Sequence, residues 1–71
     1  MPTRQEIEDL VFEVLGDLVN PEKDVEIDEL RNGSFRIIVL RNYGIPREMF
    51  WEDWKRAIEG KEGFDKVSLF V

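Results

Sequence analysis

The 71-residue chain contains neither cysteine nor histidine. Without cysteine it can form no disulfide and no thiolate zinc site. Without histidine it lacks the commonest general base, the commonest transition-metal ligand and the side chain that titrates near neutral pH. Catalytic triads and Cys/His hydrolase mechanisms are therefore excluded. We predict a protein that is not an enzyme and binds no cofactor.

Long apolar runs are also missing, and none approaches the ~20 residues that span a bilayer. The first residues, Met-Pro-Thr-Arg-Gln-Glu, lack the apolar segment of a secretory signal. We therefore expect a soluble, cytoplasmic protein that does not enter the membrane. The length corresponds to one small domain over residues 1–71. A chain this short buries only about 60% of its unfolded surface, so its stability should be modest.

Positive charge is scarce in the first half of the chain. The formal net charge is −6, and residues 1–35 hold ten acidic and three basic residues. Such a chain repels phosphate backbones, so we do not expect nucleic-acid binding, whereas a basic protein surface is attracted. Three acids, Asp24, Glu26 and Asp28, alternate along one segment. Glu29 stands where a calcium loop needs glycine, so we expect a solvated strand face and no metal site.

The clearest periodic segment predicts a helix over residues 4–19. Thr3 and Glu6 have the spacing of a capping box, and Asn20-Pro21 is a typical helix stop. Apolar residues recur at steps of three and four and form one stripe: Ile7, Leu10, Val11, Val14, Leu15 and Leu18. The opposite side carries a row of acids that can face a basic partner or only solvent: Glu6, Asp9, Glu13 and Asp17.

Two strand-like segments meet at Asn32-Gly33, which is typical of a two-residue type I′ turn with φ > 0 at both positions. This turn places Val25 opposite Leu40, Ile27 opposite Ile38, and Glu29 opposite Arg36. The predicted core face of the hairpin therefore carries Val25, Ile27, Ile38 and Leu40. Two cross-strand ion pairs are also predicted, Glu29–Arg36 and Asp24–Arg41.

The second half of the chain predicts a helix near residues 46–59, between Pro46 and Gly60, and a short strand with Val67, Leu69 and Val71 alternating. The connection through this helix is long enough to make the last strand parallel to the second strand of the hairpin. We predict an α+β two-layer sandwich in the order helix-strand-strand-helix-strand. Two helices pack on a three-stranded mixed sheet whose central strand is the second.

The predicted register leaves an apolar second sheet face. Its candidate interface residues, with Trp51 added as the aromatic off the main helical stripe, are Leu30, Phe35, Ile37, Val39, Phe70 and Trp51. Monomers seldom leave such a patch uncovered. Three explanations stay open: each helix covers a different face, the face pairs with a second copy or a partner, or the strand was designed with residues of high β propensity.

The helix ending Leu18-Val-Asn-Pro21, followed by a hairpin, resembles the opening of type II KH RNA-binding domains. The resemblance covers about half the chain. In that family, a Gly-x-x-Gly loop between two later helices clamps the nucleotide backbone. Only one later helix is predicted here, so we expect neither that loop nor RNA binding.

Two functions from different classes remain open. The first is a designed or redesigned scaffold without biochemical activity, suggested by the absence of two residue types and by agreement between caps, turns and periodicity. The second is an acidic interaction module, an inhibitor or adaptor that binds a basic protein. A homodimer through the second sheet face is a further expectation.

Overall fold

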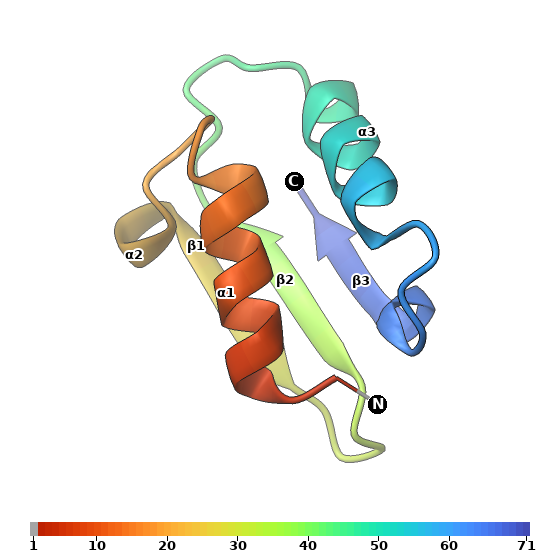
Figure 1. Cartoon of the computed structure of the whole chain (residues 1–71). Coiled ribbons are helices and arrows are strands. Elements are labelled where there is room, and N and C mark those ends of the chain that lie inside the picture. The colour runs from red at the N-terminus through yellow and green to blue at the C-terminus, as the bar shows by residue number, and fades with distance from the viewer. Residues whose placement is uncertain (1) are drawn as a thin grey trace.

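The structure is a computed structural model and describes residues 2–71 (Figure 1). Its elements are helix α1 (Arg4–Leu15), the short helix α2 (Pro21–Asp24), strands β1 (Val25–Glu29) and β2 (Phe35–Val39), helix α3 (Arg47–Ile58), the 3₁₀ turn η1 (Phe64–Lys66) and strand β3 (Val67–Phe70). The sheet order is β1-β2-β3, with β1 antiparallel and β3 parallel to β2. Both long helices lie over one face of the sheet (Figure 1). The predicted two-layer α+β fold is confirmed.

Helix α1 begins where the capping box predicts. The Glu6 N–H donates to Thr3 Oγ1 at 3.2 Å, and the Thr3 N–H donates to Glu6 Oε1 at 3.0 Å. The helix ends at Leu15, before Gly16, rather than at residue 19. Asn20 is therefore not the stop of α1. It caps α2, where its side chain accepts from the Glu22 N–H at 3.1 Å.

The hairpin turn differs from the predicted type I′ turn by one residue. Leu30 N–H donates to the Ser34 carbonyl at 2.8 Å, so the loop holds three residues, 31–33. Gly33 has φ 82°, and Asn32 is not among the residues with positive φ. The Asn32 side chain instead accepts from the Ser34 N–H at 3.1 Å. Three-residue loops with a left-handed glycine are the next most common hairpin connection after two-residue ones.

This extra loop residue shifts the register, so Val25 pairs with Val39, Ile27 with Ile37, and Glu29 with Phe35. A shift by one turns every side chain of a strand to the other face. The predicted core face, with Ile38 and Leu40, is therefore wrong. Three of the predicted interface residues are buried in the core instead: Phe35, Ile37 and Val39.

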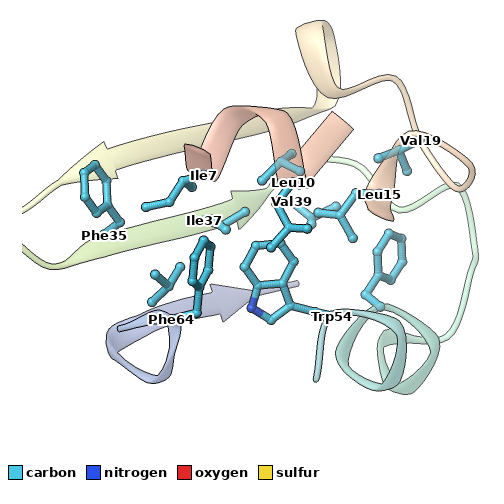
Figure 2. Close-up of a cluster of buried hydrophobic side chains, with 12 residues drawn as sticks. Ile7, Leu10, Leu15, Val19, Phe35, Ile37, Val39, Trp54 and Phe64 are labelled. Atoms are coloured by element: carbon cyan, nitrogen blue, oxygen red, sulfur yellow. The ribbon is translucent and has the colours of Figure 1, made fainter. Parts of the chain in front are cut away.

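The core lies between the helices and the inner face of β2. Figure 2 shows Ile37 and Val39 among side chains from both layers, including Ile7, Leu10 and Trp54. Because α1 and α3 both contribute buried residues to the cluster that β2 enters from one face, the arrangement with a helix on each face is excluded. Residues 2–71 leave the other face of the sheet open.

Candidate functional site

The open face of the sheet carries a small apolar patch, which we define as Ile38, Leu40 and Phe70. Ile38 lies beside Phe70 in the parallel ladder. Leu40 is 61% exposed and Phe70 is 50% exposed, while Ile38 is half-buried. Of the residues predicted for this face, only Phe70 thus belongs to the patch.

Charged residues border this patch on the β1 side. Arg36 Nη2 lies 3.5 Å from Asp28 Oδ2, replacing the predicted Glu29–Arg36 pair after the register shift. Glu26 is paired with Ile38 across the ladder and is exposed. The face is therefore amphipathic, with charged side chains toward β1 and apolar ones toward β3.

The other two predicted interface residues lie on the surface away from this patch. Leu30 is 38% exposed at the start of the hairpin loop, and Trp51 is 42% exposed on α3. The Arg47 guanidinium lies 5.9 Å from the Trp51 ring centre, close enough for a cation–π contact. Neither residue contributes to the apolar patch, so the six predicted residues do not form one surface.

A polar junction joins the β2–α3 connection to α2. Asp24 is buried, and its Oδ2 accepts from the Tyr43 hydroxyl at 2.9 Å and from the Asn20 N–H at 3.2 Å. The bond to Asp24 raises the pKa of Tyr43 above its usual 10.0. Asp24 is thereby occupied within the fold and is not free for the predicted pair with Arg41. The guanidinium of Arg41 lies instead 5.1 Å from the Tyr43 ring centre.

The acidic row of α1 borders a groove on the described surface. A hollow of about 430 Å³ lies between α1 and the segment that precedes β3. Leu10 and Phe64, both buried core residues, contribute to its lining. Its charged lining is Glu6, Asp9, Glu13, Glu62 and Lys61. Four carboxylates thus meet one ammonium group in a hollow with apolar side chains in its lining.

A second hollow extends this groove toward α3. It measures about 330 Å³ and shares Glu13 with the first. Asp17 and Asp53 also line it, and Arg56 lies 3.9 Å from Asp53. We call the two hollows together the acidic groove. Three of the four predicted acids line the first hollow, and the fourth, Asp17, lines the second.

Two of these carboxylates are already hydrogen-bonded. The Thr3 N–H bond to Glu6 lowers the pKa of that carboxyl below its usual 4.5, so Glu6 is charged at neutral pH. Gln5 Nε2 donates to Asp9 Oδ1 at 2.8 Å. Each carboxylate still has a second oxygen and further lone pairs, so the groove can accept hydrogen bonds from ammonium or guanidinium groups.

Sequence reasoning missed one motif. Gly60-Lys61-Glu62-Gly63 has the Gly-x-x-Gly spacing of KH domains, and both glycines have positive φ, 79° and 88°. It lies between α3 and η1, so the expectation that the loop is missing is wrong. The helical segment after it, however, is a single turn. The adjoining hollow is lined by Lys55 and Lys61 but also by three carboxylates, those of Glu59, Glu62 and Asp65, which oppose a phosphate.

Among residues 2–71, no group of three or more carboxylates is gathered closely enough to hold a metal ion. No helix in this part of the chain is long and apolar enough to cross a membrane. Comparison with known proteins adds no relative, since no family model, curated protein or solved structure matches the chain.

Proposed function

We propose that the protein is a non-enzymatic interaction module whose acidic groove binds a basic segment of a partner protein. The observation that supports this proposal is the acidic groove itself, where a row of acids on α1 borders a hollow that also has apolar lining. A ligand that suits it carries lysine or arginine side chains together with an apolar side chain that reaches Leu10 and Phe64.

The electrostatic argument rests on where the charges lie. Acids outnumber bases in both hollows, and among the described residues that line them only Arg56 and Lys61 are basic. A basic segment that approaches this surface is attracted before contact, which raises the association rate more than the final affinity. Each exposed pair contributes about 0.2–1 kcal/mol, so several pairs and an apolar contact are needed for useful affinity.

The experiment measures binding of a short, fluorescently labelled peptide that alternates lysine and leucine. We expect binding that weakens steeply between about 20 mM and 150 mM salt. The double variant Asp9→Asn/Glu13→Gln removes two groove charges without altering the capping box. It is expected to weaken binding about fivefold, the effect of two exposed ion pairs.

The matched control is Glu48→Gln/Glu52→Gln, which removes two charges from exposed positions of α3 outside the groove. It changes the net charge equally and should leave affinity within about twofold. Equal losses in both double variants would show that the peptide responds only to net charge, and the groove proposal would then be wrong.

A single-stranded oligonucleotide is the second probe. Its binding at physiological salt would favour the Gly60–Gly63 loop as the binding site instead of the groove.

The second candidate function is a designed scaffold with no activity of its own. The agreement between local signals favours it: the capping box is complete, and Gly33, Gly44, Gly60 and Gly63 all occupy positive φ. Such a scaffold should bind neither the basic peptide nor the oligonucleotide at physiological salt, which separates it from the interaction module.

A further inference from the structure

The two edges of the sheet are protected very differently. A free edge presents unpaired N–H and C=O groups, and proteins block it with charged residues, prolines or covering segments. Strand β1 carries Glu26, Asp28 and Glu29, and the Arg4 guanidinium donates to the Ile27 carbonyl at 3.1 Å. The β1 edge therefore has both charge and a side chain bonded to its backbone.

Strand β3 has none of these devices in the part of the chain that the structure describes. Its residues Val67–Phe70, with Val71 after them, include no charged side chain, no proline and no glycine. Its backbone pairs only with β2 among the residues that the structure describes, and no side chain of residues 2–71 bonds to it. Ser68 is exposed, and Leu69 and Val71 are only half-buried although they lie on the inner face.

The strand is also complementary to itself. In an antiparallel pair of two copies centred on Leu69, each Val67 lies opposite the second copy's residue 71, and Leu69 faces its own equivalent. All inner-face pairs are then apolar, as cross-strand pairs that stabilise a sheet commonly are. On the open face, Phe70 lies opposite Ser68 of the second copy, so its exposed ring is partly covered without a steric conflict between two aromatic rings.

Charge permits this approach despite the net charge of −6 on each copy. The order of the resulting six-stranded sheet is β1-β2-β3 followed by the same strands in reverse. With strands about 4.8 Å apart, the two acidic β1 strands are about 24 Å from each other. This distance exceeds the Debye length of about 8 Å at physiological salt, so the repulsion is largely screened.

We propose that the protein forms a dimer in solution by antiparallel pairing of β3 with β3 of a second copy. The area buried by one short strand pair is small compared with the ~800 Å² that each partner buries in a standard interface. The dissociation constant of the dimer is therefore expected to be about 10–500 μM rather than nanomolar. The inference does not rest on the acidic groove, whose lining includes none of residues 67–71.

The test measures the solution mass of the full chain by sedimentation equilibrium between about 5 μM and 1 mM. The wild type should shift from one chain to two across this range. Ser68→Lys and Ser68→Glu each place a charge on the exposed edge strand and should remain single chains throughout. Both signs of charge are tested because Arg36 is the ladder partner of Ser68. A lysine at position 68 repels Arg36, whereas a glutamate is attracted to it, so the glutamate variant is less destabilised.

Leu40→Lys is the control, because it adds a charge to the open face but not to β3, and it should dimerise like the wild type. Tryptophan fluorescence, to which the buried Trp54 and the exposed Trp51 both contribute, reports that each variant is folded. A wild type that stays a single chain at the highest concentration overturns the proposal. A dimer that forms in both Ser68 variants also overturns it. A dimer that is lost only in Leu40→Lys would indicate pairing through the open face of the sheet and would likewise contradict the proposal.

Discussion

Asp24 is an acid that stabilises the fold through its side chain. Its buried carboxylate ties the Tyr43 hydroxyl and the Asn20 N–H to one oxygen. Asp24→Ala should lower the free energy of unfolding by about 2 kcal/mol, because two donors lose their acceptor. Urea denaturation followed by tryptophan fluorescence measures this change. Glu22→Ala, an exposed neighbour, should cost much less, and equal costs would contradict the junction's role.

The Tyr43 hydroxyl gives this junction a pH signature. Its pKa is raised in the folded protein by the bond to Asp24, so folding favours the protonated phenol. The bond's contribution to stability is full below the unfolded pKa of about 10 and is lost as pH rises from there through the higher folded value. Tyr43→Phe lacks the bond at every pH. The wild type should therefore be more stable than the variant below this window, and the difference in the free energy of unfolding should disappear above it.

Ile37 and Leu40 distinguish the observed register from the predicted one. Ile37 is 0% exposed, so Ile37→Lys should abolish cooperative unfolding by burying an unpaired charge. Leu40→Lys should change the free energy of unfolding by less than about 0.5 kcal/mol, since the side chain is already in solvent. Thermal melts of the two variants measure the difference. The opposite ranking would restore the two-residue turn.

At the scale of elements, the α1 capping box offers the sharpest test. Thr3→Ala removes the acceptor of the Glu6 N–H and should cost about 1 kcal/mol, whereas Thr3→Ser should cost much less. The Glu6 pKa is lowered in the folded state, so its contribution is present above the unfolded value near 4.5 and is lost as pH falls through the folded value. Urea melts at pH 7 and pH 3 check both statements. The Thr3 backbone N–H that donates to Glu6 is still present in Thr3→Ala, so Glu6→Gln tests the other half of the box. If Glu6→Gln loses as much stability between pH 7 and pH 3 as the wild type does, the Glu6 half of the box contributes nothing.

Local signals were enough to predict most elements. The order of the strands and long helices and the parallel β3 follow from four signals: the cap at Thr3, the apolar stripe of α1, Pro46 just before α3, and the long crossover. The register was not predictable, because Asn32-Gly33 also occurs in a three-residue loop where only glycine has positive φ. Choosing between the loops requires knowing which face of β2 meets the helices, and both faces are apolar.

The candidate site was predictable only in part. The α1 acids follow from helical period alone, and they border the groove as one side of the helix. The lining from Lys61, Glu62 and Phe64 depends on where the chain returns after α3, which no local pattern specifies. The interface prediction relied entirely on the register, so Phe35, Ile37 and Val39 were assigned to the wrong face together.

For the molecule as a whole, charge distribution predicts a response to salt. The excess of acids in residues 1–35 concentrates like charge along α1, α2 and β1, and the resulting repulsion is screened by ions. Raising potassium chloride from about 20 mM to 500 mM should increase Tm by about 3 °C, corresponding to about 0.5 kcal/mol. Calorimetry of dilute protein measures this. A Tm that falls with salt would mean that ion pairs such as Arg4–Glu8 outweigh the repulsion.

We expect the parallel ladder between β2 and β3 to form late during folding. The hairpin and α1 are close in sequence and can form early, but Phe64 and Val67 reach the core only after the chain has passed through α3. Closing that long loop costs entropy before its contacts are gained. Substitutions that weaken β3 should therefore speed unfolding while leaving the folding rate almost unchanged. The lifetime of the native state is then set by the strand that arrives last.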